Sequence, residues 1–187
     1  MKKIIVDSSG NGDFSTIQEA LQLNYDELYI ILKPGIYYGQ IFSTKKQLVI
    51  KGESCKNTII TGNIGAKDPY RGNGVCDSSI DFASEKSGSC TDDNRLDDNV
   101  QFEEKNRNEN QFGDEVSKKS KELTGTFRTY TAYFSGKNVR LENLTIENTA
   151  GQGTDVGQSV ALYASSEYFH CKNVRLISYQ DTLFTAS

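Results

Sequence analysis

Short runs of alternating apolar and polar residues, separated by turn-forming residues, recur along this 187-residue chain. After residue 24, no segment carries helical apolar spacing over the length of a helix, so strands must supply most of the regular structure. Sixteen Gly residues and two Pro residues also fit a fold with many turns. The expected strands are Leu28–Leu32, Ile36–Phe42, Leu48–Lys51, Thr58–Thr61, Tyr130–Phe134, Val139–Ile146, Val160–Tyr163, Tyr168–Leu176 and Leu183–Thr185. The pattern predicts an all-β protein.

One short helix is expected near the N-terminus, within Gly12–Leu21. Ile17, Ala20 and Leu21 would form its apolar face, because residues three or four apart lie on one side of a helix. Ser15, followed three residues later by Gln18, has the pattern of a capping box.

A five-residue sequence occurs twice, as Lys137-Asn-Val-Arg-Leu141 and, 35 residues later, as Lys172-Asn-Val-Arg-Leu176. Repeats spaced by roughly 20–50 residues are typical of solenoids, whose coils stack on one another. Asn tolerates left-handed backbone, and stacked Asn side chains can hydrogen-bond between coils. The Asn residues of this region are therefore interpreted as structural; they are Asn138, Asn143, Asn148 and Asn173. The repeat favours a parallel β-helix over a sandwich, with residues 1–187 forming one domain.

Residues 66–122 interrupt the strand pattern. Within them, Asp92–Glu122 carries ten acidic and six basic residues and few branched apolar ones. Such a segment buries too little apolar surface to offset the entropy lost on ordering. It is predicted to be a long, mobile polar insertion at the surface, with a substrate-facing role as the alternative.

Charge and hydropathy exclude several classes of function. The net charge of −4 argues against a nucleic-acid partner. No apolar run approaches the ~20 residues that span a bilayer. Met1–Val6 begins like a signal peptide, but Asp7–Gly12 ends the apolar part well short of the roughly 7–15 residues required, so no export signal is expected.

The four cysteines leave the redox state open. Cys55, Cys76, Cys90 and Cys171 form no C-x-x-C pair, so a zinc site is not expected. Cys76 and Cys90 could form a disulfide in an oxidising compartment. Cys55 and Cys171 flank apolar runs and are equally compatible with partly buried free thiols.

The polar residues narrow the possible chemistry to carboxylates and amides. The single histidine, His170, lies within an expected strand and is interpreted as structural; a nucleophile elbow and clustered metal ligands are absent from the sequence. A carboxylate can hydrolyse an ester through an acyl intermediate if a second carboxylic acid releases the alcohol and donors stabilise the oxyanion. Gln158, Gln180 and Asp181 could supply an acid and amide donors on stacked coils. Taken alone, however, Gln-Asp in a turn is usually only a turn.

Several blocks together resemble the pectin methylesterase family, in the order in which that family carries them. The resemblance covers nearly the whole chain except residues 66–122. The blocks are Gly12-Asp-Phe-Ser-Thr-Ile-Gln-Glu-Ala20, Leu32-Lys-Pro-Gly-Ile-Tyr37, Ile50-Lys-Gly-Glu53, Leu144-Thr-Ile-Glu-Asn-Thr-Ala-Gly151, Gly157-Gln-Ser-Val-Ala-Leu162 and Tyr179-Gln-Asp-Thr-Leu183, with Thr126-Phe-Arg-Thr-Tyr-Thr131 as a shorter match.

The resemblance implies a right-handed parallel β-helix that hydrolyses galacturonate methyl esters in pectin without a cofactor or metal. Asp181 would be the general acid/base, Gln158 and Gln180 the oxyanion-hole donors, and Thr131 a residue lining the substrate cleft. A monomer acting outside the cell or in the cell wall would be expected.

The chain departs from the family pattern after the Gln-Asp-Thr-Leu block. The family's later blocks, which carry the nucleophilic Asp and a substrate-holding Arg, do not occur in this sequence. The chain is therefore expected to be an N-terminal portion of such an enzyme, ending on an open coil, and inactive or nearly so by itself. The alternatives are a non-catalytic galacturonan-binding β-helix, a pectate lyase or polygalacturonase, and a structural fragment without a ligand.

Overall fold

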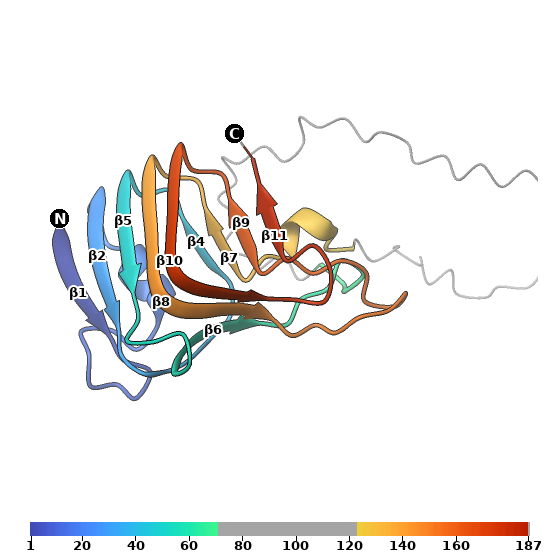
Figure 1. Cartoon of the computed structure of the whole chain (residues 1–187), viewed down its shortest axis with the longest axis horizontal. Helices are drawn as coiled ribbons and strands as arrows, with labels where there is room; N and C mark the ends of the chain where they lie inside the picture. Colours follow the sequence, from blue (N-terminus) through green and yellow to red (C-terminus); the bar gives the residue numbers. More distant parts are fainter. Residues whose placement is uncertain (71–122, 187) are drawn as a thin grey trace, which may run out of the picture. The chain divides into compact units, whose positions relative to one another are not determined.

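The computed structural model describes residues 1–70 and 123–186, and these form a right-handed parallel β-helix, as the sequence predicted (Figure 1). Every pair of named strands in the described part runs parallel. The elements are β1 (Lys2–Val6), α1 (Ile17–Leu21), β2 (Glu27–Leu32), β3 (Gly35–Tyr38), β4 (Ile41–Ser43), β5 (Gln47–Lys51), β6 (Thr58–Gly62), a 3₁₀ turn (Thr126–Arg128), β7 (Ala132–Phe134), β8 (Asn138–Asn148), β9 (Leu162–Ala164), β10 (Tyr168–Ile177) and β11 (Leu183–Thr185). Of the polar insertion predicted at 66–122, residues 71–122 lie outside the described residues.

Two sheets form the walls of the coil. A seven-stranded sheet has the order β1-β2-β5-β8-β6-β3 with β10 on β8, and a four-stranded sheet has the order β11-β9-β7-β4. The first half of β8 pairs with β5 and the second half with β6, so this long strand belongs to two faces of the coil. The strand expected at Ile36–Phe42 is two strands, because Gly39 has a φ of 106° and turns the chain between β3 and β4.

An Asn pair marks the bend in the long strands. Asn143 and Asn173 have φ angles of 53° and 57°, and Asn173 Nδ2 donates to Asn143 Oδ1 at 3.2 Å. The expected side-chain hydrogen bond between stacked Asn residues is thus confirmed for this pair. The 35-residue repeat is nevertheless wrong as a coil period. Asn138 lies opposite Tyr168, a separation of 30 residues, because the register follows the stacking of inward side chains rather than the repeated letters.

The core fills the inside of the coil with columns of equivalent residues. Leu28 pairs in register with Leu48, which pairs with Val139, and each of the three is at most 1% exposed. Ile30, Ile50 and Leu141 form a second column two residues further along. Full burial of one such side chain contributes about 1.5–3 kcal/mol, so these columns supply much of the stability of the fold.

The N-terminal helix forms where it was expected, but the predicted capping pair is wrong by one residue. Thr16 is the N-cap, and its hydroxyl and the Glu19 carboxylate complete the capping box. Gln18 is not available for capping, because its Oε1 accepts a hydrogen bond from the backbone N–H of Phe42 at 3.0 Å. Gln18 therefore ties the helix to β4.

The remaining structural predictions are settled only in part. Among the described residues, Cys55 and Cys171 are free thiols, whereas Cys76 and Cys90 lie outside the described ranges. In residues 1–70 and 123–186, no helix has the length and apolar character needed to cross a bilayer.

Replacement of Tyr37 by Phe should flatten the fall in stability at alkaline pH. The Tyr37 hydroxyl donates to the carbonyls of Val6 and Lys33, at 3.0 and 2.7 Å, and burial raises the pKa of Tyr37 from 10.0 to about 12. Stability linked to a raised pKa is complete below the unfolded pKa and is lost as the pH rises toward the folded one. Between pH 10 and 12, the parent should therefore lose about 2 kcal/mol more than the variant. Urea unfolding at pH 8, 10 and 12 measures this difference; parallel curves would contradict it.

Candidate active site

The three polar residues predicted to act together lie just before two neighbouring strands. Gln158 precedes β9, and Gln180 and Asp181 precede β11, which pairs directly with β9. An isolated bridge joins Ser159 to Gln180, in which the Ser159 N–H donates to the Gln180 carbonyl at 3.2 Å. The fold thereby brings Gln158, Gln180 and Asp181 to adjacent coils on one edge of the four-stranded sheet.

Asp181 is exposed at the tip of a tight turn. Its φ of 57° is left-handed, a conformation that Asp and Asn adopt more readily than most residues. The next carbonyl, that of Thr182, accepts hydrogen bonds from the N–H groups of Ala161 and Leu162, both at 3.1 Å. The backbone on one side of the turn is anchored, while the carboxylate of Asp181 faces solvent.

Gln158 is half-buried and oriented by a neighbour. The Thr126 hydroxyl, in the 3₁₀ turn, donates to Gln158 Oε1 at 3.2 Å. Because the amide oxygen takes that hydrogen bond, the NH₂ end of Gln158 is presented elsewhere as a donor. Gln180 has an exposed side chain. Two amides and one carboxylate are therefore available at this edge.

Thr131 does not line a surface, and its predicted contact with substrate is corrected. The side chain is fully buried, and its hydroxyl donates to the Glu147 carbonyl at 2.8 Å. It packs on Gly62, where an added Cβ would lie 2.6 Å from the Thr131 hydroxyl oxygen. The neighbouring Asn148 is also buried, with its Nδ2 at 2.7–3.2 Å from the carbonyls of Ile64, Thr129 and Val160. Both side chains therefore hold backbone segments together inside the coil.

Comparison with known proteins finds similarity to pectinesterases. A family model described as Pectinesterase matches residues 95–187. A pectinesterase of Petunia integrifolia is 26% identical over 94% of this chain and 33% of its own length. A probable pectinesterase/pectinesterase inhibitor 21 of Arabidopsis thaliana is 27% identical over 98% of this chain and 20% of its own length. The chain is similar to pectinesterases over nearly its whole length.

Solved structures support the fold of this chain. The pectin methylesterase from carrot superimposes with a TM-score of 0.62 at 20% identity, covering 97% of this chain and 41% of that protein. Pectin methylesterase PemA from Erwinia chrysanthemi gives a TM-score of 0.60 at 22% identity, covering 97% and 44%. The chain thus spans a third or less of the length of the two curated relatives and less than half of these structures.

His170 lies away from the candidate residues, as the sequence indicated. It is in β10, in register with Arg140 of β8, and so belongs to the seven-stranded sheet rather than to the sheet that carries Asp181. Within the described ranges, no group of three or more His, Cys, Asp or Glu side chains is placed to hold a metal ion.

A row of aromatic side chains beside Asp181 was not predicted. Each strand of the four-stranded sheet has three residues, with an aromatic residue in the middle. Neighbouring ring centres along the row are 5.2, 4.6 and 4.7 Å apart, and Phe127 approaches the last ring at 4.9 Å. The row is Phe42, Tyr133, Tyr163 and Phe184, paired in register.

The aromatic row points away from the core. Ile41, Ala132 and Leu162, each next to a row residue in its strand, lie in the core cluster. Phe42 and Tyr133 are buried, whereas Tyr163 and Phe184 are partly exposed. Phe184, at the exposed end of the row, follows Asp181 by three residues in the sequence. One signal in the sequence could have revealed the aromatic row. Each of these short strands has an aromatic residue at its second position.

Proposed function

We propose that this chain carries part of the active site of a carboxylic ester hydrolase that removes methyl groups from galacturonate in pectin. The observation that carries the proposal is the bridge between Ser159 and Gln180, which sets Gln158, Gln180 and Asp181 on one edge of adjacent coils. Pectin as the substrate, a monomeric state and an extracellular or cell-wall location follow from the family and belong to the same proposal.

The chemistry assigns one role to each residue. A carboxylate attacks the ester carbonyl carbon, and negative charge develops on the carbonyl oxygen, where the amide N–H groups of Gln158 and Gln180 donate. Asp181, protonated, gives its proton to the departing methoxide oxygen as the carbon–oxygen bond breaks, so that methanol leaves and an acyl anhydride forms. Asp181 then takes a proton from the water that hydrolyses the anhydride. The described residues supply the acid and the donors; the attacking carboxylate is not assigned among them.

The aromatic row supplies a surface for the sugar. Tyr163 and Phe184 are partly exposed, and Phe127 is 39% exposed. Aromatic faces bury the apolar face of a pyranose ring while leaving its hydroxyls in water. A pectin methylesterase with a TM-score of 0.61 to this chain was solved in complex with a hexasaccharide, which supports an oligosaccharide as the ligand class.

Methanol release from highly methyl-esterified pectin tests the proposal, measured for the 187-residue chain alone and, because that chain is expected to be nearly inactive by itself, with a C-terminal pectinesterase portion supplied. Release that falls about a hundredfold or more in Gln158→Ala would support it, since loss of one oxyanion donor costs roughly 10²–10³ in rate. The second candidate is a galacturonan-binding β-helix without turnover, favoured by the aromatic row together with a single assigned carboxylate. It predicts retardation in pectin-containing gels that survives Asp181→Asn, with no methanol. If the chain neither released methanol nor was retarded in the gel, both candidate functions would be contradicted.

Replacement of Thr126 by Val should lower methanol release about tenfold with little change in KM. The variant keeps the side-chain shape but removes the hydroxyl that orients the Gln158 amide at 3.2 Å. Disorder of a donor aimed at the developing charge weakens binding of the transition state more than binding of the substrate. Initial rates over a range of pectin concentrations separate kcat from KM. Thr126→Ser, which keeps the hydroxyl, should retain most of the rate, and an equal loss in both variants would contradict the orienting role.

A further inference from the structure

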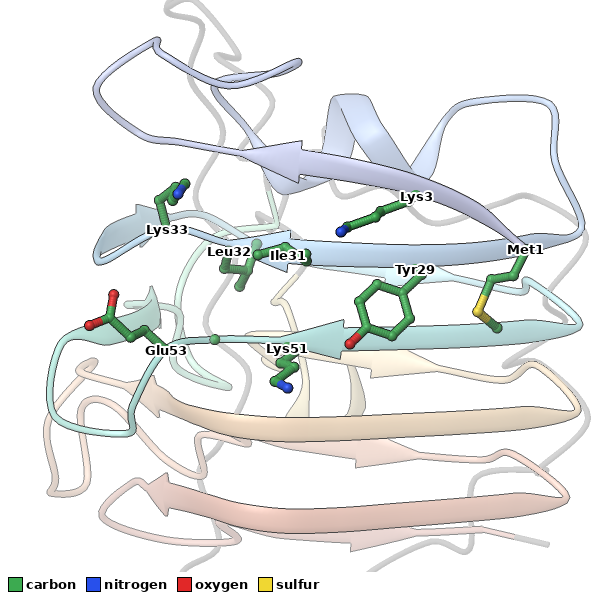
Figure 2. Close-up of a pocket in the computed structure, with 9 residues that line it drawn as sticks. Met1, Lys3, Tyr29, Ile31, Leu32, Lys33, Lys51 and Glu53 are labelled. Atoms are coloured by element: carbon green, nitrogen blue, oxygen red, sulfur yellow. The ribbon is translucent and has the colours of Figure 1, made fainter.

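A groove lies on the outer surface of the seven-stranded sheet, over β1, β2 and β5 (Figure 2). Its volume is about 640 Å³, and its walls include Lys3, Tyr29, Ile31, Lys33, Lys51 and Glu53. Figure 2 shows Lys33 and Glu53 at one end and Tyr29 nearer the other. Asp181 precedes β11, which belongs to the other sheet, so this groove is not part of the candidate active site.

The strand register makes the floor both apolar and basic. Lys3 lies opposite Tyr29 across β1 and β2, and Ile31 lies opposite Lys51 across β2 and β5. These side chains alternate with Leu28 and Ile30, which point into the core, so all four face outward. An aromatic ring and an aliphatic side chain are thereby set among ammonium groups.

The ammonium groups of the groove have few internal partners; the charge of Lys33 acts on Asp7, whose pKa is lowered by hydrogen bonds from Ser9 and also by Lys33. Within the described ranges, Lys3 and Lys33 form no salt bridge. Lys51 Nζ is 3.9 Å from Glu142 Oε2, whereas Arg140 Nε lies 2.5 Å from the other oxygen of the same carboxylate. Arg140 therefore satisfies Glu142, and Lys51 can turn to a ligand at little cost. Glu53 is the one carboxylate among the lining residues, so the groove is locally positive in a chain of net charge −4.

We propose that this groove binds a carboxylated oligosaccharide, the de-esterified galacturonate product, as a second site remote from the chemistry. The inference rests on the proposed function for the identity of the sugar. Lys3 and Lys51 stand two strand spacings apart and two residues apart along the strands, about 12 Å in all, which suits charges repeated along a chain better than one compact anion. Tyr29 and Ile31 offer an apolar floor to the sugar rings. A methyl-esterified chain carries no such charges, so the groove distinguishes product from substrate.

Binding of unesterified trigalacturonate to the full 187-residue chain tests this inference. Titration at low salt should give saturable binding, and the methyl signals of Ile31 should shift in NMR spectra while those of Ile177, on β10, do not. The double variant Lys3→Gln, Lys33→Gln should bind at least fivefold more weakly. Raising the NaCl concentration should weaken binding further, because exposed charges are screened. Fully methyl-esterified trigalacturonate should leave the Ile31 signals unchanged.

The matched control is Lys137→Gln, Lys172→Gln, which removes the same charge from exposed positions outside the groove. Equal weakening in both double variants would overturn the inference, since only overall charge would then matter. An equal Ile31 shift at the same concentration of inorganic phosphate would also overturn it, in favour of a general anion site. Methanol release without an Ile31 shift would refute the groove alone, and an Ile31 shift without methanol release would refute only the proposed catalysis.

Discussion

Replacement of Asp181 by Asn is expected to lower methanol release from methyl-esterified pectin by about a hundredfold to ten-thousandfold, the usual contribution of a positioned general acid. The variant removes the transferable proton and little else. Asn is tolerated at a φ of 57°, and the side chain is exposed, so the turn and its backbone hydrogen bonds through Thr182 should persist. Alanine would be a poorer choice, because it would add backbone strain to the loss of the acid.

Asp26→Asn is the matched control for this experiment. Asp26 is also exposed and pairs with Lys46 at 2.6 Å, between α1 and β2 and outside the candidate site. It changes the net charge by the same amount, and an exposed pair contributes at most about 1 kcal/mol to stability. Methanol release should stay within about twofold of the parent. If Asp181→Asn retained full activity while unfolding at the parent's urea midpoint, Asp181 would not be the acid.

Replacement of Gly136 by Ala should lower the free energy of unfolding by about 3 kcal/mol, the upper end of the usual cost of overpacking. An added Cβ would lie 1.8 Å from the Lys45 carbonyl oxygen and 2.9 Å from its carbon. The two turns cannot move apart easily, because Ser135 donates to the Ser43 carbonyl at 3.0 Å and Asn138 to that of Lys46 at 2.9 Å. The clash therefore acts against the stacking of β7 and β8 on the preceding coil.

Gly10→Ala separates this steric effect from the general cost of replacing glycine. Gly10 has a φ of 85° and no atom within 4 Å of an added Cβ, so alanine there meets backbone strain of about 1 kcal/mol without a clash. Urea unfolding of both variants and the parent, at one temperature and pH, measures the two terms. A loss at Gly136 no larger than that at Gly10 would mean that the turns separate without cost.

The positions of most strands were predictable because each of them carries its own alternation, although β1 was not expected and β9 begins two residues later than expected. Tyr168–Leu176 and Leu183–Thr185 were expected from sequence and correspond to β10 and β11 within one residue. Successive side chains of a strand point to opposite faces of the sheet, so the alternation of apolar and polar residues in a short segment is enough to indicate the strand. The same holds for the helix, although its capping pair was displaced because Gln18 bonds to β4 instead.

The register between coils was not predictable in the same way. The repeat of Lys137–Leu141 at Lys172–Leu176 predicted a period of 35 residues, yet Asn143 meets Asn173 across 30. A repeated five-residue sequence does not determine the number of residues in the turns that separate the two strands. Only the stacking of buried columns, such as Leu28, Leu48 and Val139, selects one register over another.

For the candidate site too, some features could be predicted from the sequence and others could not. The sequence by itself determined the resemblance to pectin methylesterases, the strand content and the short blocks that hold Gln158, Gln180 and Asp181, because these are properties of contiguous residues. Only the tertiary structure decided that Thr131 is buried, that Thr126 orients Gln158, and that the rings of Tyr163 and Phe184 meet. Those outcomes depend on which coil lies on which, and stacking joins residues whose separation along the chain carries no local signal.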